Sequence, residues 1–480
     1  MQTLTLVTLW LYVLISTSFL LHHLQLKEYR FDRLYDYLRF EHGYKRLFRL
    51  PASLIYLVIF ANLFIQNELL LQISIIVAFV TCLFHTLISG FYRFTPTKKA
   101  LIIYTLNLIA LYFVKDPSLI YLLSPLTLTA LVVVFMPLSK AGKERVIAKA
   151  KLKREAMKDL VVIGITGSYG KSSTKEMLYE LLKDKFCTLK TPKNINTDIG
   201  VARHLLANLK SEHQVYVVEM GAYRIGEIKN ICKFAKPKIG ILTAIAPQHI
   251  SLFGSLQNIK IAKSELIQAV PEGGLAIINV DSLEGKDVAD HTKVKTETYT
   301  KSSEFKYKAD LNAPFLYTNL HAASLAAKEL GMTDDEIQTA ITKLDKSISP
   351  IKFRNGINQS QILDDSYNSN PQGFAEAIKL ADKTKASGRK ILLTRGMIEL
   401  GEISDQEHEK IAHLAAQIFD EVIITKPEIK KPFAKNIQNL KYIKKADDLI
   451  HYLQNNLAHG DLLLIENRQP PIVINSIIQD

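Results

Sequence analysis

Cysteine is scarce in this chain of 480 residues, and the cysteines present are scattered. Cys82, Cys187 and Cys232 stand far apart, and no CxxC pair occurs. A disulfide framework and a cysteine-ligated zinc site both need closer or paired spacings, so neither is expected. No internal repeat is apparent, and the length allows about three domains.

Acidic residues are also in short supply, with 47 Asp and Glu against 60 Lys and Arg and a formal charge of +13. Such an excess is typical of proteins that meet nucleic acid, a membrane surface or an acidic substrate. Much of it lies before residue 155, between long apolar stretches. That placement favours a membrane, and it leaves no need for nucleic-acid binding.

Charge is absent from residues 3–21, an apolar stretch long enough to cross a bilayer. No basic region precedes it and no clear cleavage site follows it, so a membrane span is expected in place of a signal peptide. Further apolar stretches lie at about 52–66, 69–91, 100–114 and 118–137. Because the shorter ones barely reach across a bilayer, the sequence predicts a transmembrane region, 1–138, of four or five helices.

The positive charges predict an orientation. Basic segments lie at 24–50, 93–99 and 140–154, and five spans with the N-terminus outside put all three on one side. The positive-inside rule makes that side the cytoplasm, where ATP is available. Residues 139–158 then form a basic juxtamembrane linker, which is either a solvated connector or a contact with anionic lipid.

From residue 159 onward, strand-like apolar runs alternate with amphipathic stretches. The expected strands are 160–165, 214–219, 238–243, 275–279, 390–394 and 461–465, and the clearest helical patterns are 174–186, 255–269 and 320–330. Alternation of this kind indicates parallel sheets covered by helices. The helical periodicity breaks at 344–356, so two α/β domains are expected, at 159–346 and 347–480.

The most informative stretch is VVIGITGSYGKSST, residues 161–174. A buried strand leads into a glycine-rich turn, where Gly167 and Gly170 allow the backbone to approach a polyphosphate. Lys171 would reach the outer phosphates, and the Ser172 hydroxyl would bind Mg²⁺. Ile165 occupies the place of the first glycine in the generic pattern, and an ordinary strand-to-helix turn is the alternative. The combination predicts a nucleotide site.

Other polar residues follow later strands, and each has an ordinary explanation by itself. Glu219 ends the second expected strand, where a carboxylate is well placed for Mg²⁺ but is more often a loop residue. His249 follows the third strand, and Lys263 lies on the next helix, where a surface charge is the ordinary role. The asparagines at 194, 196 and 368 and the aspartates at 364 and 365 are typical of turns.

Together these motifs resemble the Mur ligases, which form amide bonds of peptidoglycan precursors with ATP. The resemblance covers about residues 159–480 and is strongest to the branch that adds D-alanyl-D-alanine to a muramoyl tripeptide. It is carried by TGSYGKSSTK (166–175), EMGA (219–222), APQHISLFGSLQNIKIAKSE (246–265), NLHAASLAAKELG (319–331) and DDSYNSNP (364–371). The fold it implies is a P-loop central domain and a Rossmann-like C-terminal domain, both α/β.

The resemblance also implies roles for particular residues. ATP and Mg²⁺ would be the cofactors, with Lys171, His249 and Lys263 catalytic and with Lys263 carbamylated. The metal ligands would be Ser172, Glu219, His249 and Lys263. Nucleotide contacts would come from Thr166, Gly167, Ser168, Gly170, Lys171, Ser172, Ser173, Asn319, Arg354 and Asp365. Substrate contacts would come from Asn194, Asn196, Asn368 and Asn370.

Three departures from the family pattern limit what the resemblance implies. APFLYTN, 313–319, replaces the usual G-R-H-N before Asn319, and Thr394 to Met397 replaces L-G-D-M. The N-terminal domain that grips the UDP-sugar is missing, and apolar stretches stand in its place. The expected partners are therefore a UDP-linked or a lipid-linked peptidoglycan precursor, a D-alanyl-D-alanine-like amine and membrane lipids, at a bacterial cell membrane.

The implied chemistry is acyl activation: an acceptor carboxylate attacks the γ-phosphate, and an amine then displaces phosphate from the acyl phosphate. Two other functions stay open. One is a related ligase with a different acceptor, such as the folyl-polyglutamate or cyanophycin type; the other is a membrane-anchored nucleotide-binding scaffold without activity. A zinc-containing relative that amidates lipid-linked precursor would need four clustered cysteines, which this sequence lacks. Nothing in the sequence predicts an oligomeric state.

Overall fold

The computed structural model describes residues 2–40, 50–89, 94–193, 195–311, 313–344, 351–366 and 370–479. The chain divides into two compact units, 1–144 and 145–480. The first is helical, and the second contains two separate sheets. Helix α7 is common to both, because its 39 residues run from Pro117 to Glu155.

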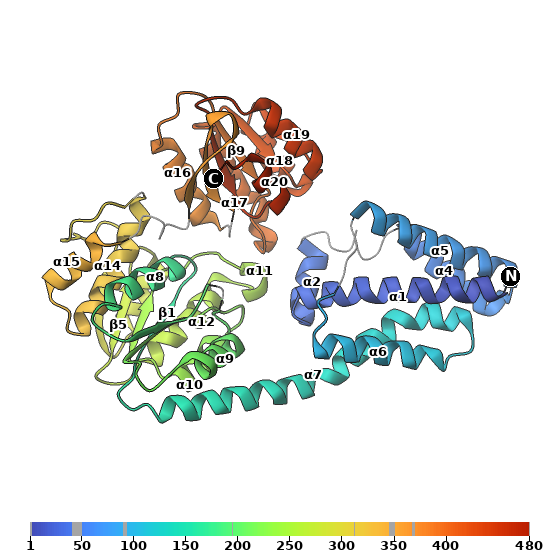
Figure 1. The fold of residues 1–480 in the computed structure, drawn as a ribbon, viewed down its shortest axis with the longest axis horizontal. Helices are drawn as coiled ribbons and strands as arrows, with labels where there is room; N and C mark the ends of the chain where they lie inside the picture. Colours follow the sequence, from blue (N-terminus) through green and yellow to red (C-terminus); the bar gives the residue numbers. More distant parts are fainter. Residues whose placement is uncertain are drawn as a thin grey trace. The chain divides into compact units, whose positions relative to one another are not determined.

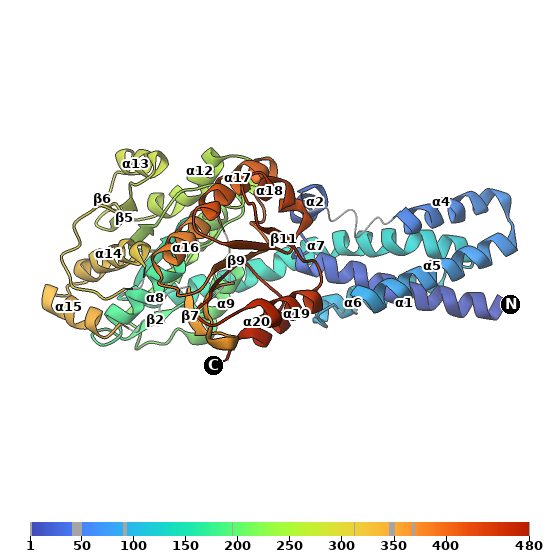
Figure 2. The ribbon, with the colours of Figure 1, turned by 90° about the horizontal axis from the view of Figure 1, so that it is seen from above.

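The first unit is a bundle of apolar helices. They are α1 (Gln2–Leu26), α2 (Phe31–Phe40), α4 (Leu50–Ile65), α5 (Glu68–Ser89), α6 (Lys98–Tyr112) and the first part of α7. Helices α1, α4, α5 and α6 lie lengthwise beside one another (Figure 2). Within the described residues, two helices are long and apolar enough to cross a membrane, Thr3–Leu26 and Pro117–Glu155, and two shorter apolar helices cover Ser53–Ile65 and Glu68–Phe84.

A polar contact joins three of these helices inside the bundle. Asn107 of α6 is fully buried; its side-chain amide donates to Thr17 of α1 at 3.3 Å and accepts from Thr127 of α7 at 2.6 Å. Elsewhere in the bundle, apolar side chains such as Leu9, Ile59 and Ile75 form a buried cluster. An internal hydrogen bond of this kind fixes which helix faces meet.

The first sheet of the second unit has six parallel strands in the order β2-β3-β1-β4-β5-β6. The elements are β1 (Val161–Thr166), α8 (Lys171–Leu182), β2 (Thr188–Lys190), α9 (Asp198–Asn208), β3 (Val215–Glu219), α10 (Glu227–Ala235), β4 (Ile239–Leu242), α11 (Ile250–Phe253), α12 (Leu256–Gln268), β5 (Leu275–Asn279), α13 (Leu283–Asp290), β6 (Lys295–Tyr299), α14 (Pro314–Glu329) and α15 (Asp334–Thr342).

Helices cover the first sheet on both sides (Figure 1), and alternating residues of β1 pack against opposite layers. Ile163 and Ile165 pack with α8 and α14, whereas Val162 packs with α9, α10 and α12. Both faces are covered, as the parallel arrangement requires. After β1 the chain forms β2 and β3 on one side of β1 and then crosses to form β4 on the other side. The loop after β1 therefore lies at the switch point, where α/β sheets bind ligands.

The second sheet has the order β11-β10-β9-β12-β8-β7. Its elements are β7 (Lys352–Asn355), β8 (Gln361–Asp365), α16 (Pro371–Lys383), β9 (Lys390–Thr394), α17 (Ser404–Ala416), β10 (Glu421–Ile424), α18 (Lys430–Ala434), β11 (Leu440–Tyr442), α19 (Ala446–Asn456), β12 (Leu462–Glu466) and α20 (Pro471–Ile477), with short 3₁₀ turns at Ile357–Gln359, Gly401–Ile403 and Pro427–Ile429. The expectation of wholly parallel sheets is wrong here, because β7 pairs antiparallel with β8. Only a short connection joins these two strands, which is too short for a parallel crossover.

Candidate active site

The loop after β1 holds the chain in a conformation that its two glycines make possible. Gly167 has φ of +150°, and a Cβ there would lie 2.1 Å from the Thr243 hydroxyl. Gly170 has φ of +80° and precedes the first residue of α8; a Cβ there would lie 2.6 Å from the Asn319 side-chain oxygen. The backbone of this loop is therefore close-packed against α14 and the end of β4.

Hydrogen bonds fasten the loop to the neighbouring strand ends. The Ser168 hydroxyl donates to the Ala246 carbonyl at 2.9 Å and accepts from the Ala246 N–H at 3.0 Å. The Thr166 hydroxyl donates to the Met220 carbonyl at 2.9 Å. The structure thus gives both predicted nucleotide contacts a local task, which is to fix the loop before any ligand arrives.

Lys171 opens helix α8 and turns back over the loop. Its ammonium donates to the carbonyls of Gly167, at 2.6 Å, and Ser168, at 3.2 Å. Burial lowers the pKa of Lys171, while the Glu219 charge acts in the opposite direction. A cation beside free N–H groups at a helix start is an arrangement that receives phosphate. Ser173 lies buried in the same turn.

Glu219 is the centre of a buried polar cluster at the end of β3. Its side chain is 3% exposed. One carboxylate oxygen, Oε2, accepts from the Ser172 hydroxyl at 2.9 Å and from the Lys175 ammonium at 3.0 Å. The other, Oε1, accepts from the Asn196 amide at 3.1 Å. The P-loop serine and the predicted metal carboxylate are therefore in direct contact.

The electrostatics keep this carboxylate ionised. Burial by itself would raise the pKa of Glu219, but the charges of Lys175 and Lys171 outweigh it and hold that pKa below its ordinary value. A hydroxyl and a carboxylate are hard oxygen donors of the type that Mg²⁺ prefers. In the described part of the chain, no group of three His, Cys, Asp or Glu side chains is placed to hold a metal. The donors present fit Mg²⁺ that takes its remaining ligands from phosphate and water.

Lys263 lies on α12 and is almost completely buried, at 3% exposure. Burial lowers the pKa of Lys263 well below its ordinary value, and the nearby Lys171 charge adds to this effect. A lysine held in this environment is poised to be a neutral amine. The expectation of a surface charge, drawn from the helix alone, is wrong for this residue.

His249 has φ of +52° and immediately precedes α11. Its ring lies 4.7 Å from the Tyr223 ring, centroid to centroid, and its Nδ1 pairs with the Glu399 carboxylate. The Glu399 carbonyl also accepts from the Ser251 hydroxyl at 3.0 Å. The histidine is thus oriented by a tyrosine that follows β3 and by a carboxylate that follows β9.

Of the predicted residues near the second sheet, Arg354 and Asp365 lie on neighbouring strands. The Arg354 guanidinium pairs with Asp364 at 3.2 Å. Burial raises the pKa of Asp365 to about 6. Asn370 caps α16, since its side chain accepts from the Gly373 N–H at 2.9 Å. Asn194 and Asn368 lie outside the described residues.

Comparison with known proteins agrees with this arrangement. Residues 165–342 match the Mur ligase middle domain, and residues 351–466 match the Mur ligase glutamate ligase domain. The UDP-N-acetylmuramoyl-tripeptide–D-alanyl-D-alanine ligase of Buchnera aphidicola is 30% identical over 322 residues, which are 61% of this chain and 70% of that protein. This chain belongs to the Mur ligase family.

Two further relatives agree with that assignment. The ligase of the same name from Bacillus subtilis is 26% identical, over 64% of this Mur ligase and 72% of the relative. A crystal structure of MurF from Acinetobacter baumannii has the same fold, with a TM-score of 0.63 and 22% identity, covering 69% of this chain and 80% of that one. As a Mur ligase, the protein is an ATP-dependent ligase that uses Mg²⁺.

Sequence reasoning missed three side chains that this Mur ligase brings into the site: Lys175, Tyr223 and Glu399. Lys175 follows Lys171 by four residues, so the helical period alone places both on one face of α8. Tyr223 stands four residues after Glu219 in a loop, and nothing in its spacing marks it. Glu399 is 150 residues from His249, and only the folded chain brings them together.

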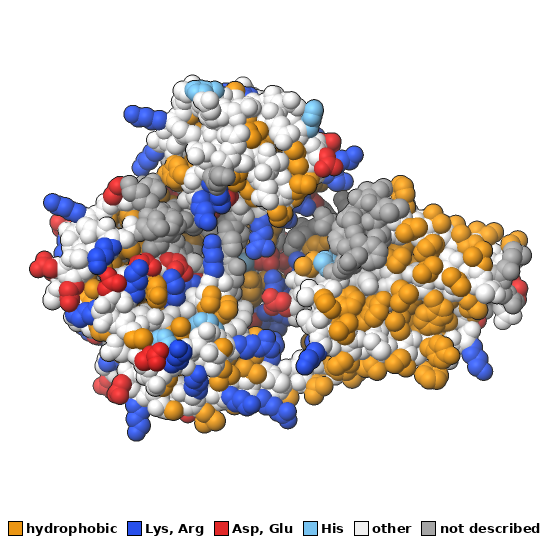
Figure 3. Space-filling view, in the orientation of Figure 1, with side chains coloured by type: hydrophobic (Ala, Val, Ile, Leu, Met, Phe, Trp, Pro, Cys, Tyr) orange, Lys and Arg blue, Asp and Glu red, His pale blue; other side chains and the backbone are white. Residues whose placement is uncertain are grey.

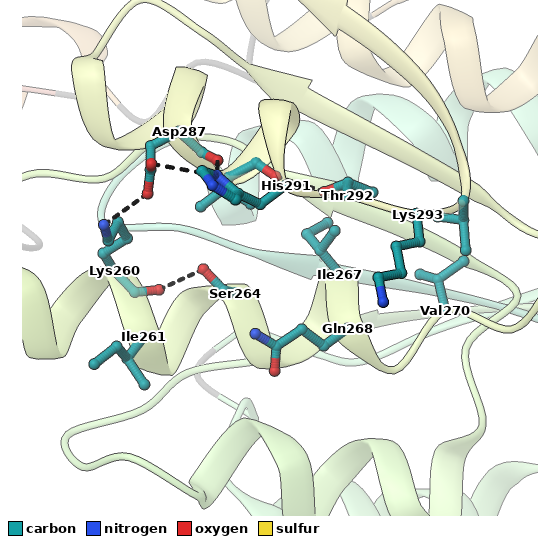
Figure 4. A pocket seen from close by; sticks show the side chains of 12 residues that line it. Lys260, Ile261, Ser264, Ile267, Gln268, Val270, Asp287, His291, Thr292 and Lys293 are labelled. Atoms are coloured by element: carbon teal, nitrogen blue, oxygen red, sulfur yellow. Dashed lines mark hydrogen bonds and ion pairs between the residues drawn. The ribbon is translucent and has the colours of Figure 1, made fainter.

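A separate cavity of about 530 Å³ lies between α12 and α13 (Figure 4). Lys260 pairs there with Asp287 at 2.7 Å. Its other lining residues are Ile261, Ser264, Ile267, Gln268, Val270, Val288, His291, Thr292, Lys293 and Val294. None of the predicted site residues lines it, so its size does not mark the active site of this Mur ligase.

Proposed function

We propose that this Mur ligase joins the amine of D-alanyl-D-alanine to the terminal carboxyl of a muramoyl tripeptide, converting ATP to ADP and phosphate. The observation that carries the proposal is the buried cluster in which Ser172, at the start of the phosphate loop's helix, contacts Glu219. The names of the Buchnera and Bacillus relatives support the choice of amine and acceptor. A related ligase with another acceptor remains the alternative.

The chain's own groups have three tasks in the reaction. The loop N–H groups and Lys171 hold the γ-phosphate in line with the acceptor carboxylate and neutralise charge as it is transferred. The metal ions would be held by Ser172, Glu219, His249 and Lys263, the last as a carbamate. Bound Mg²⁺ supplies positive charge at the phosphate oxygens. The amine then attacks the acyl phosphate, loses a proton and expels phosphate.

The remaining predicted residues have supporting roles in this assignment. The phosphate loop is shaped by Thr166, Gly167, Ser168, Gly170 and Ser173. Further contacts with the nucleotide would come from Asn319, Arg354 and Asp365. The position of Asn319 against Gly170 supports its part in this assignment. Contacts with the substrates would come from Asn194, Asn196, Asn368 and Asn370. Asn370 also caps a helix.

We propose in addition that the first unit anchors the enzyme in a bacterial membrane. Large apolar side chains gather over the outside of this unit (Figure 3), among them Leu57, Phe64, Val80 and Leu126, each more than half exposed. Such a surface is costly in water and favourable in lipid. In this assignment residues 1–138 are the membrane region with four or five spans, 139–158 the linker, and 159–346 and 347–480 the ligase domains in the cytoplasm.

The test is turnover by full-length protein purified in detergent, with ATP, Mg²⁺ and D-alanyl-D-alanine. UDP-linked tripeptide is the acceptor in one reaction and lipid-linked tripeptide in the other. We expect ADP release that requires both acceptor and amine, with an amide product of the expected mass, and a Lys171→Ala rate lower by about 100-fold or more because the phosphates lose their cation.

Each other outcome selects between alternatives. Turnover with only one acceptor identifies how the acceptor is carried. ATP binding without turnover on either acceptor contradicts the proposal and favours a different acceptor or a scaffold. Equal rates for Lys171→Ala and the unaltered protein would mean that Lys171 takes no part in the reaction, and they would contradict the proposed site.

A further inference from the structure

Lys175 is a buried charge with no part in the mechanism above. It lies on α8, one turn after Lys171, and its side chain is fully buried. Its ammonium lies 3.0 Å from Glu219 Oε2, 3.6 Å from Glu176 Oε1 and 3.5 Å from the Pro192 carbonyl. A buried ammonium is costly unless charges and hydrogen bonds of this kind compensate it, so Lys175 and Glu219 form a unit.

The ammonium meets the carboxylate at the oxygen that the metal would use. Ser172 and Lys175 both contact Oε2, whereas Oε1 is taken by Asn196. A cation bound jointly by the Ser172 hydroxyl and Glu219 must therefore approach Oε2 beside an ammonium. Two positive charges a few ångströms apart in a buried site repel each other strongly.

We propose that Lys175 is a positioning residue that holds Glu219 in place before metal arrives and weakens its affinity for Mg²⁺ alone. Magnesium then enters together with the nucleotide, whose phosphates supply the additional negative charge that offsets the ammonium. This inference rests on the metal site of the proposed function. In this inference, Lys175 makes the filling of the metal site by Mg²⁺ depend on bound nucleotide.

A purely structural ion pair would have a different consequence. In that case Lys175 would stabilise the fold, and its removal would leave the response to Mg²⁺ unchanged. The two roles are separated by a metal titration without nucleotide or substrate, which needs no catalysis.

The experiment compares full-length protein with its Lys175→Gln variant, which keeps an N–H donor but removes the charge. Magnesium is titrated in the absence of nucleotide and followed by calorimetry and by thermal unfolding. Binding of Mn²⁺, followed by the loss of its free electron-paramagnetic signal, gives an independent measure. We expect Lys175→Gln to bind either cation about tenfold more tightly or better, and to gain more thermal stability from Mg²⁺.

Two further variants sharpen the comparison. Lys190→Met removes a cation that pairs with Glu176, and that pair lies beside the cluster without touching Glu219. We expect its Mg²⁺ affinity to equal that of the unaltered protein. Lys175→Arg keeps the positive charge and should keep the weak affinity. Equal affinity of Lys175→Gln and the unaltered protein, or an equal shift in Lys190→Met, overturns the proposal.

We expect Lys175→Gln to fold less stably, because Glu219 loses its counter-charge. Folding that Mg²⁺ restores supports the proposal, whereas folding that only a second substitution, Glu219→Gln, restores indicates a purely structural ion pair and overturns it. Folding that neither restores overturns it. Because no substrate is used, a tighter metal site in Lys175→Gln stands even where the ligase assay fails, and the two failures are distinguishable.

Discussion

At the scale of single residues, the site depends on charges held out of water. Lys171, Lys175 and Lys263 are three lysines near one carboxylate, Glu219. Each has different neighbours: Lys171 donates to loop carbonyls, Lys175 pairs with the carboxylate, and Lys263 is buried on α12, which lowers its pKa. Three lysines with the same pKa in water thus have three different tasks.

Lys263 offers a direct test of the carbamate. A neutral amine is needed to add carbon dioxide, and burial of Lys263 favours that form. We expect Lys263→Ala to lose activity by about 100-fold or more because a metal ligand is gone. Added bicarbonate should raise the rate of carbonate-depleted unaltered protein and leave Lys263→Ala unchanged. Equal activity of the two proteins would remove the carbamate from the mechanism.

How far the sequence predicted these residues depends on how local their contacts are. The contact between Ser172 and Glu219 follows from two strand ends of one parallel sheet, and the motifs mark both residues. The packing that buries Lys263 comes from tertiary structure, so its helix alone suggested a surface charge. Asn370 caps α16, a position at which asparagine is strongly preferred, and its predicted contact with substrate stays a prediction.

At the scale of elements, α7 continues past its apolar part into the second unit. The basic segment at its end was expected as a linker, and the helix does run to Glu155. Arg154 is not solvated, however: its guanidinium donates to the carbonyls of Ala235, at 3.1 Å, Met157, at 2.8 Å, and Leu160, at 2.9 Å. These three acceptors fix the end of α7 against the first sheet's domain.

Replacement of Arg154 by methionine tests this attachment. We expect Arg154→Met to lower the free energy of unfolding of the ligase part by about 2–4 kcal/mol, because three buried carbonyls lose a charged donor. Lys149→Met, on an exposed face of the same helix, is the matched control and should change stability by less than about 0.5 kcal/mol. Chemical denaturation followed by circular dichroism would measure both. Similar values for the two variants would make Arg154 an ordinary surface residue.

The apolar strands could be predicted to within about one residue, because a continuous apolar run bounded by turn residues is a strong local signal. The strands from 275 to 279 and from 390 to 394 agree with β5 and β9. Strands β2, β6, β7, β10 and β11 were not predicted, and of these only β10 (EVII) is largely apolar and fully buried. β2 has three residues, and β6 (KTETY) lies at the sheet edge with only Tyr299 buried, so pairing with a neighbour makes them strands.

At the scale of the whole molecule, a helical bundle and two α/β domains are joined in one chain. The prediction of two α/β Mur ligase domains is confirmed. The prediction of membrane spans in the bundle stays a prediction, supported by two long apolar helices and two shorter ones. The apolar composition of this region predicts helices, but it does not predict which helix packs against which.

Membrane attachment is tested by fractionation. We expect the full-length protein to sediment with membranes and to resist extraction by alkaline carbonate or high salt, since apolar burial is insensitive to both. Detergent should release it. Release by salt alone would indicate that the basic segment binds a surface electrostatically, and recovery in the soluble fraction would contradict the anchor.

The transfer of one oxygen atom tests the ligase most directly. The acceptor is labelled with ¹⁸O in its terminal carboxylate and incubated with the protein, ATP, Mg²⁺ and D-alanyl-D-alanine. If that carboxylate attacks the γ-phosphate and the amine then expels phosphate, one ¹⁸O must appear in the phosphate released. We predict singly labelled phosphate in the same amount as the amide product. Unlabelled phosphate would mean that water cleaves ATP, and it would contradict the ligase reaction.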